Sequence, residues 1–174
     1  MAEWYVLHVH LDREEKIAEL LKRKLTPQLY RPFILQKEKF FRRAGVTSIV
    51  GGICFPGYVF IESQTSADEF LDAAKQLLWN IKDVHSLLSY DGKEDIALRE
   101  NSMMLLKRLI GEGDCIKVSR GHIVDGIARV DSGALVGMDG LIKKVDKHNK
   151  TAEIEVTLMG EPQRIRLALE IIKS

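Results

Sequence analysis

The pattern of apolar residues changes near Cys115, and this change constrains the fold more than any other feature of the chain. Before it, apolar residues recur at helical spacing in three stretches, separated by short runs rich in β-branched and aromatic residues. After it, helical spacing disappears and five short β-rich runs alternate with glycines. The sequence therefore predicts an α+β protein of two domains. Residues 1–111 form an antiparallel sheet flanked by helices, residues 112–123 a linker, and residues 124–174 a small β-barrel.

The first domain is expected to begin with a strand and a helix. Residues 4–9 alternate along a strand, which places His8 on the same face as Trp4. The helix that follows is expected to have Asp12 as its N-cap, with Glu15 three positions later in a capping box.

Two further helices and a hairpin arm are expected in this domain. Ser66 is a plausible cap for the second helix, and the third runs over residues 98–110. Residues 33–43 are typical of a strand arm, and residues 44–52 of a turn-like insertion. A hairpin tip bearing Arg42 and Arg43 either contacts nucleic acid or is merely solvated, and the sequence slightly favours solvation.

A proline and a glycine precede the strand expected over residues 58–61. Pro56 lacks an N–H group and Gly57 tolerates unusual backbone angles, so the chain is expected to bend before the strand starts. Side chains alternate along a strand, so Tyr58 and Phe60 share one face while aliphatic residues occupy the other. Both faces are apolar, which by itself favours a buried central strand.

Composition excludes several classes of protein. The net charge is +1, with 45% hydrophobic and 29% charged residues, so no global field marks a nucleic-acid-binding protein. The cysteines, Cys54 and Cys115, lack partners at metal-ligand spacing, and we expect reduced thiols and neither metal nor cofactor. We see no signal peptide, membrane span or catalytic motif, and expect a cytoplasmic monomer that is not an enzyme and does not bind membranes.

Two motifs carry a resemblance to a known family. Phe55-Pro56-Gly57-Tyr58-Val59-Phe60 resembles the signature strand of the N-terminal (NGN) domain of the NusG family of transcription elongation factors. The run from Ala128 to Ile142 resembles a KOW motif, in which Gly140 is expected where a Cβ would obstruct a sharp turn. The two motifs occur in the order of that family, and the resemblance covers nearly the whole chain.

The resemblance implies a partner and a site. In NusG-like proteins the NGN domain docks on the clamp helices of bacterial RNA polymerase through a hydrophobic concavity on its sheet. The matching positions here are His8, Phe55, Tyr58 and Phe60. A row of aromatics with one histidine suits a helix-in-groove interface. The alternative is that the phenylalanines fill a core and His8 is an ordinary surface residue.

The C-terminal domain departs from the housekeeping pattern. Gly133-Ala134-Leu135 stands where the family commonly has Gly-Pro-Phe, and Met159-Gly160-Glu161 where the housekeeping protein has Phe-Gly-Arg. These departures resemble the LoaP branch of paralogues. That resemblance implies an antiterminator that promotes read-through in selected operons and is recruited by a nascent RNA hairpin.

Basic residues give that RNA contact a physical basis. A strand and turn rich in lysine is expected to present a basic edge to phosphates, although such a turn is usually just solvated. The candidate RNA-binding residues are Lys143, Lys144, Lys147, His148 and Lys150, extended by Lys117, Arg120, His122, Arg129, Arg164 and Arg166.

Two other functions stay open on the sequence alone. One is a general housekeeping factor that couples polymerase to termination or translation, which Met159 and Glu161 count against. The other is a free-standing RNA-binding module in which the first domain is only structural.

Overall fold

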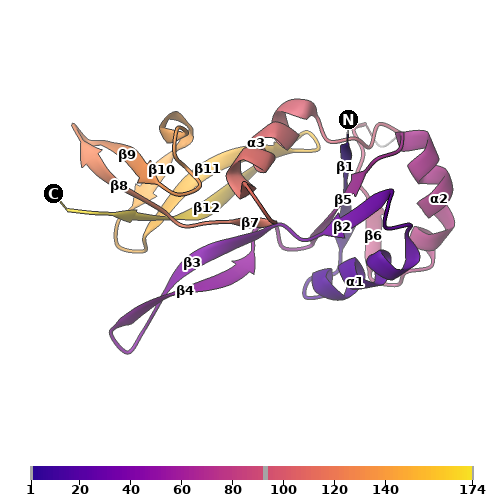
Figure 1. The fold of residues 1–174 in the computed structure, drawn as a ribbon, viewed down its shortest axis with the longest axis horizontal. Helices are drawn as coiled ribbons and strands as arrows, with labels where there is room; N and C mark the ends of the chain where they lie inside the picture. Colours follow the sequence, from indigo (N-terminus) through magenta and orange to yellow (C-terminus); the bar gives the residue numbers. More distant parts are fainter. Residues whose placement is uncertain (1, 92–93, 174) are drawn as a thin grey trace. The chain divides into compact units, whose positions relative to one another are not determined.

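The computed structural model describes residues 2–91 and 94–173, so the first and last residues of the chain and the pair Gly92–Lys93 lie outside it. The chain forms two compact units (Figure 1). Unit 1 contains the chain up to Leu35 together with Phe55–Met103, and unit 2 contains Gln36–Cys54 together with the chain from Met104 onward. Within the described part, no helix is long and apolar enough to cross a membrane.

Unit 1 is built on an antiparallel sheet of four strands, in the order β2-β5-β1-β6. The prediction of a strand over residues 4–9 is confirmed by β1. The strands and helices are β1 (Glu3–Val9), β2 (Tyr30–Phe33), β5 (Tyr58–Ser63), β6 (Val84–Leu87), α1 (Glu14–Lys24) and α2 (Ala67–Trp79).

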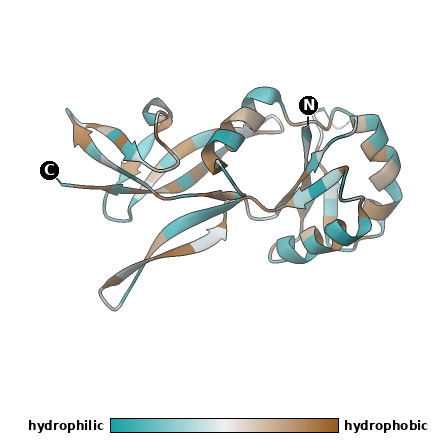
Figure 2. Ribbon diagram, in the orientation of Figure 1, coloured by the Kyte–Doolittle hydropathy of each residue, from teal (hydrophilic) through white to brown (hydrophobic). Residues whose placement is uncertain are grey.

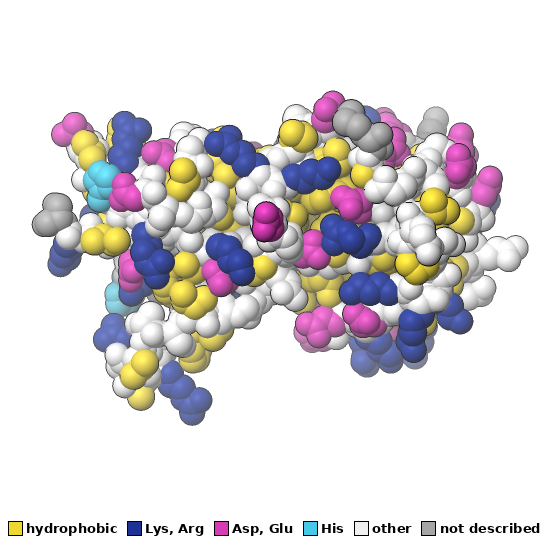
Figure 3. Space-filling model, viewed as in Figure 1, with side chains coloured by type: hydrophobic (Ala, Val, Ile, Leu, Met, Phe, Trp, Pro, Cys, Tyr) yellow, Lys and Arg dark blue, Asp and Glu magenta, His cyan; other side chains and the backbone are white. Residues whose placement is uncertain are grey.

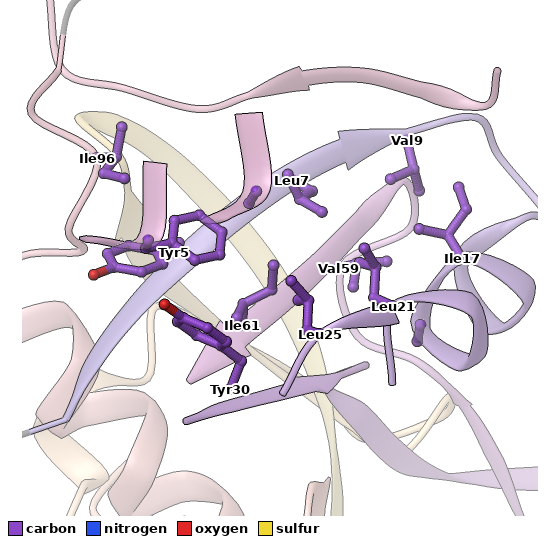
Figure 4. Packing of buried hydrophobic residues seen from close by; sticks show 13 residues of the cluster. Tyr5, Leu7, Val9, Ile17, Leu21, Leu25, Tyr30, Val59, Ile61 and Ile96 are labelled. Carbon is purple, nitrogen blue, oxygen red and sulfur yellow. The ribbon is translucent and has the colours of Figure 1, made fainter. Parts of the chain in front are cut away.

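The two helices pack against one face of this sheet. Alternation along β1 sends Tyr5, Leu7 and Val9 to that face, where they meet Ile17 and Leu21 of α1 (Figure 4). Hydrophilic and hydrophobic residues are interleaved along α1 and α2, as an amphipathic helix over a sheet requires (Figure 2). The opposite parity of β1, which includes His8, is therefore on the other face.

The two predicted helix caps had different outcomes. The prediction for α2 is confirmed, because the Ser66 hydroxyl accepts a hydrogen bond from the Glu69 N–H at 3.3 Å. The prediction for α1 is wrong: its N-cap is Arg13, and no side chain caps the helix. Asp12 has a φ of 68°, so a tight left-handed turn occupies the position from which a capping side chain would act.

The segment predicted as a turn-like insertion is a strand. β3 (Gln36–Arg43) and β4 (Val46–Ile53) pair along their whole length, and the turn between them consists only of Ala44 and Gly45. These two residues have φ values of 51° and 80°, which is typical of a two-residue hairpin turn. Exposed Arg42 and Arg43 stand next to the turn, at the tip of the hairpin.

Unit 2 is a sheet of five strands in the order β10-β11-β12-β8-β9, plus the hairpin β3–β4, to which β7 adds in parallel. Pairing within the five-stranded sheet is antiparallel except between β12 and β8. The elements are α3 (Glu100–Ile110), β7 (Cys115–Ile116), β8 (Ser119–Val124), β9 (Ile127–Ser132), η1 (Asp139–Leu141), β10 (Lys144–Asp146), β11 (Thr151–Leu158) and β12 (Glu161–Ile171).

The bounds of the two units can be compared with the expected domains and linker. The boundary between the units falls inside α3, and the hairpin β3–β4, which precedes the expected linker, belongs to unit 2. The linker residues themselves include β7 and most of β8.

The sequence predicts that a Cβ at Gly140 would obstruct the turn, and this prediction is wrong. A Cβ at Gly140 would meet nothing within 4 Å, because this residue lies in the short helix η1 and faces open space. Within the same motif, Gly133 is the more constrained position. It has a φ of 98°, and a Cβ there would run into the carbonyl oxygen of Val118 and the side chain of Ser119.

Candidate functional site

A histidine–tyrosine pair lies on the face of the unit 1 sheet opposite the helices. His8 on β1 and Tyr58 on β5 are register partners, and their ring centroids are 5.5 Å apart. His8 is exposed and Tyr58 half-buried, so both rings are accessible. Two of the four residues matched to the polymerase-docking surface are thus brought together.

Two more histidines extend this pair. His85 on β6 lies 5.1 Å from His8, and His10 lies 6.0 Å from His85, both between ring centroids. Sequence analysis missed them because it did not predict that β6 pairs with β1. Among the described residues, no group of His, Cys, Asp or Glu is arranged to hold a metal. We call His8, His10, Tyr58 and His85 the histidine–tyrosine surface.

The other two matched residues are inside the protein. Phe60 is 0% exposed and Phe55 is 3% exposed, and their centroids are 5.9 Å apart. Phe60 also contacts Phe33 at 5.5 Å and Trp4 at 6.0 Å. In this structure these rings can support the strand that carries Tyr58, while Tyr58 and the histidines are the accessible rings.

A buried carboxylate fixes the bend before Tyr58. Glu14, in the first turn of α1, is 2% exposed, and its Oε2 accepts a hydrogen bond from the Gly57 N–H at 3.0 Å. Gly57 has a φ of 86°, a conformation that favours glycine. Among the described residues, no hydrogen-bond partner reaches the other oxygen, Oε1. No local sequence pattern indicates this bond, because it joins residues 43 positions apart.

We expect the Glu14 carboxylate to stabilise the bend at Gly57, which precedes Tyr58. Glu14→Ala should leave the Gly57 N–H buried without a partner and lower the free energy of unfolding by about 1–3 kcal/mol. Glu14→Gln keeps an oxygen acceptor and removes a buried charge, so its stability should equal or exceed that of the parent. Urea denaturation of both variants measures the difference. Equal losses in the two would contradict a role for the hydrogen bond.

The second candidate site is on unit 2, where basic and acidic residues alternate across neighbouring strands. The register places Lys144 of β10 opposite Glu153 of β11, and Glu153 opposite Arg166 of β12. Arg164 lies opposite Glu155 in the same way. The Arg166 Nε is 3.9 Å from Glu153, and the Arg164 Nη1 is 3.6 Å from it. Several predicted RNA-binding residues therefore share one face, together with acids that the prediction did not place there.

A second group gathers around Glu170. Lys150 Nζ donates to one carboxylate oxygen at 2.9 Å and Arg120 Nε to the other at 3.3 Å. The hydrogen bond from Lys150, aided by its charge and by Arg120, holds the pKa of Glu170 below its usual value. Both cations also approach the ring of Phe40 on β3, Lys150 at 5.4 Å and Arg120 at 5.9 Å.

The turn between β10 and β11 presents two basic residues to solvent. Asp146 accepts hydrogen bonds from the Asn149 N–H at 2.9 Å and from its side-chain amide at 2.8 Å. These bonds lower the pKa of Asp146 and define the turn. Lys147 and His148 lie exposed between its ends, and exposed Lys143 lies just before β10.

The remaining candidates divide into paired and unpaired cations. Lys117 Nζ lies 3.8 Å from Glu38, and His122 Nδ1 lies 2.8 Å from Asp131. Within the described ranges, five of the predicted basic residues form no ion pair: Lys143, Lys144, Lys147, His148 and Arg129. Figure 3 shows the same mixture, with Asp and Glu side chains interspersed among the Lys and Arg of unit 2.

The chain is similar to known proteins over nearly its whole length. The family model described as "Transcription termination factor nusG" matches residues 2–107. The chain is 21% identical over 174 residues to the "Transcription termination/antitermination protein NusG" of Thermus thermophilus, covering 95% of this chain and 94% of that protein. A solved structure described as "Domain interaction in Thermotoga maritima NusG" has a TM-score of 0.56 and 21% identity, and the alignment covers 97% of this chain and 94% of that one. This similarity confirms the α+β fold class.

Proposed function

Because the chain belongs to the NusG family of transcription factors, which are not enzymes, we propose that it is an antitermination factor. It binds bacterial RNA polymerase and promotes read-through of terminators in selected operons, to which a nascent RNA hairpin recruits it. It acts as a monomer in the cytoplasm. The observation that carries the polymerase contact is the accessible histidine–tyrosine surface on the face of the unit 1 sheet opposite α1 and α2.

The chemistry of this surface suits the clamp helices of polymerase. Tyr58 offers a ring with a polar tip, and His8 and His85 offer further flat rings with hydrogen-bonding edges. Rigid aromatic residues at the centre of a contact carry much of its binding free energy. Glu14 positions Tyr58 through the Gly57 bend, and Phe55 and Phe60 support it from within. On this proposal residues 1–111 bind polymerase.

Recruitment by RNA belongs to residues 124–174, with residues 112–123 between the two functions. Lys143, Lys144 and Lys147 form no ion pair within the described part of the chain, so they can contact phosphates without first giving up an acidic partner. A hairpin stem in A-form geometry is bound mainly through its backbone, to which such lysines are suited. The LoaP-like departures support this specialised function. Neither Leu135 nor Met159 carries an aromatic ring, and both are buried, so neither position offers an aromatic contact to a partner.

A general elongation factor is the second candidate. The observation that favours it is the pairing of Arg120, Lys150, Arg164 and Arg166 with Glu153, Glu155 and Glu170, which weakens any field that the face exerts on RNA. Such a factor would work through polymerase alone.

RNA binding by the full chain separates these two functions. A pool of structured hairpins is titrated at two salt concentrations, with K143A/K144A as the test variant. We expect the parent to select a subset of hairpins, and the variant to bind these more weakly with a salt slope smaller by about 1.5, the value for two lost phosphate contacts. K16A/K24A is the matched control, since both lysines are exposed on α1 and unpaired among the residues described.

The two candidate functions predict different results in this RNA-binding experiment. An unchanged slope in K143A/K144A removes these lysines from the RNA site. Binding that shows no preference among hairpins, and fades uniformly with salt in parent and variants alike, supports the general factor.

A further inference from the structure

The hairpin β3–β4 of unit 2 has two faces, and neither has a role in the proposed function. Directly opposite residues of an antiparallel pair share a face, so Phe40 lies with Ile49 and Phe41 lies with Ser48 on the other side. The Phe40 ring lies 5.9 Å from Arg120 of β8, so its face is the one that approaches the five-stranded sheet. We call the opposite side the outer face of the hairpin, and it consists of Lys39, Phe41, Arg43, Val46, Ser48 and Val50.

An exposed aromatic ring lies at the centre of the outer face. Phe41 is 47% exposed, so the core does not account for it. Lys39 and Arg43 are two positions away from it in each direction along β3, and side chains at that spacing share a face. Its partner across the hairpin, Ser48, is too small to cover a phenyl ring. The outer face therefore offers a flat apolar surface with a cation on each side.

The positive charge of the hairpin is not neutralised locally. Lys39, Arg42 and Arg43 form no ion pair with any other residue that the structure describes. Glu38 is the only acid in the sequence of the two strands. It belongs to the face of Phe40, where it accepts a hydrogen bond from the Val118 N–H at 2.9 Å. The outer face thus complements an anionic ligand.

A ring between two cations is suited to unpaired nucleotides. Bases in a stem are stacked on one another, so a duplex is bound mainly through its backbone and an exposed ring gains little from it. Unpaired bases stack on aromatic side chains, while neighbouring lysine and arginine contact the phosphates. Phe41, Lys39 and Arg43 supply both kinds of contact on one face.

The hairpin is joined to the strand that carries part of the basic edge. Lys37 Nζ donates to the carbonyl oxygen of Arg166 in β12 at 2.7 Å. Arg166 lies opposite Glu153, which lies opposite Lys144 of β10. Figure 1 shows β3 and β4 projecting from the rest of unit 2, which leaves their turn open to a ligand.

We propose that the outer face binds unpaired nucleotides of the RNA hairpin that recruits the protein. A base stacks on Phe41, and the phosphates on either side of it meet Lys39 and Arg43. The inference rests on the proposed function, from which it takes the RNA, and it adds a site for the loop to the lysines proposed for the stem. From the sequence alone this β-hairpin is slightly more typical of a solvated arm, and the exposed ring between its cations is what changes that interpretation.

Stacking is tested at Phe41 with two RNAs. One is a hairpin selected by its binding to the full chain, and the other is its stem as a blunt duplex without unpaired nucleotides. Phe41→Ala should weaken binding of the hairpin by about tenfold, the effect of losing one stacked base, and leave binding of the duplex unchanged. Phe41→Leu should bind as weakly as Phe41→Ala, because it keeps an apolar side chain but no ring. Fluorescence anisotropy with labelled RNA measures each affinity.

Two further variants control for the loss of apolar surface. Phe41→Trp keeps a stacking surface, so its affinity for the hairpin should lie within about twofold of the parent. Ile49→Ala is the matched control, because Ile49 is 46% exposed but lies on the face of Phe40. It should also change the affinity by less than about twofold.

The cations are tested with a short oligouridylate, which has no stem. Binding is measured at two salt concentrations in the K143A/K144A chain, so that the lysines proposed for the stem do not contribute. Adding K39A/R43A should reduce the salt slope by about 1.4, the value for two lost phosphate contacts on a single strand. Arg42→Ala should leave the slope unchanged, since exposed Arg42 is next to Arg43 in sequence but lies on the other face.

Four results would overturn the proposal, and they can be told apart. Selective hairpin binding that survives both Phe41→Ala and Phe41→Leu would reject the inference while the proposed function stands. No selection among hairpins by the parent would reject the recruitment on which the inference rests, even if oligouridylate binding depends on Phe41. Binding of an oligothymidylate without binding of the oligouridylate would reassign the face to a DNA strand. Self-association in sedimentation velocity that Phe41→Ala abolishes, without oligouridylate binding, would make the outer face an interface between copies.

Discussion

Replacing Gly133 with alanine should unfold or severely destabilise unit 2. Gly133 has a φ of 98°, which costs an alanine about 1–2 kcal/mol. Its new Cβ would also overlap the carbonyl oxygen of Val118 and displace the side chain of Ser119. The Ser119 hydroxyl accepts a buried hydrogen bond from the Leu135 N–H at 2.9 Å, which the displacement would break. Together these effects should lower the free energy of unfolding by about 3 kcal/mol or more, as urea denaturation would measure.

Gly140→Ala is the matched control, because it makes the same chemical change in the same sequence motif. A Cβ at Gly140 meets nothing within 4 Å, and no left-handed backbone is required there. Its stability should therefore lie within about 0.5 kcal/mol of the parent. A Gly140→Ala variant that is as unstable as Gly133→Ala would show that the packing around these two glycines is not as described.

Tyr58→Ala should weaken binding to core RNA polymerase by about 30-fold or more, the effect of losing one central aromatic contact of about 2 kcal/mol. Tyr58 is half-buried beside His8 at 5.5 Å, so its truncation removes the largest accessible ring of the histidine–tyrosine surface. Hairpin binding by the same variant should not change, because we propose those contacts for unit 2. Fluorescence anisotropy with labelled protein gives both affinities.

Trp79→Ala is the control for loss of an exposed aromatic residue. Trp79 is more exposed than Tyr58 but lies on α2, which covers the opposite face of the sheet. Its affinity for purified polymerase should match that of the parent. If Tyr58→Ala also binds polymerase normally, the docking assignment is wrong and the free-standing RNA-binding module becomes the better account.

Local pattern was sufficient to predict much of the fold. Alternation along residues 4–9 and 58–61 assigned each side chain to the correct face of a strand, because a strand repeats every two residues. The cap of α2 was predictable for the same reason, since Ser66 acts on the third residue after it. The strand β4 was missed because its pairing with β3 compensates for a sequence that includes Gly51 and Gly52.

Contacts between distant parts of the chain could not be predicted. Glu14 looks like a solvated helix residue until the fold brings Gly57 to it, and His85 looks isolated until β6 pairs with β1. The lysine-rich edge was also predicted without its acids, because Glu153 and Glu170 come to it from neighbouring strands. The parity rule put Phe60 on the face of Tyr58 correctly, but parity does not say which residues of a face are covered.

The most direct test of selective antitermination is single-round transcription with purified polymerase on two templates. Both carry the same terminator, and only one encodes, upstream of it, a hairpin selected from the pool by its binding to the full chain. We predict that the protein raises read-through on the hairpin template alone, and that K143A/K144A and Tyr58→Ala each abolish the increase. Equal read-through on both templates, or an effect that survives both variants, would contradict the proposal.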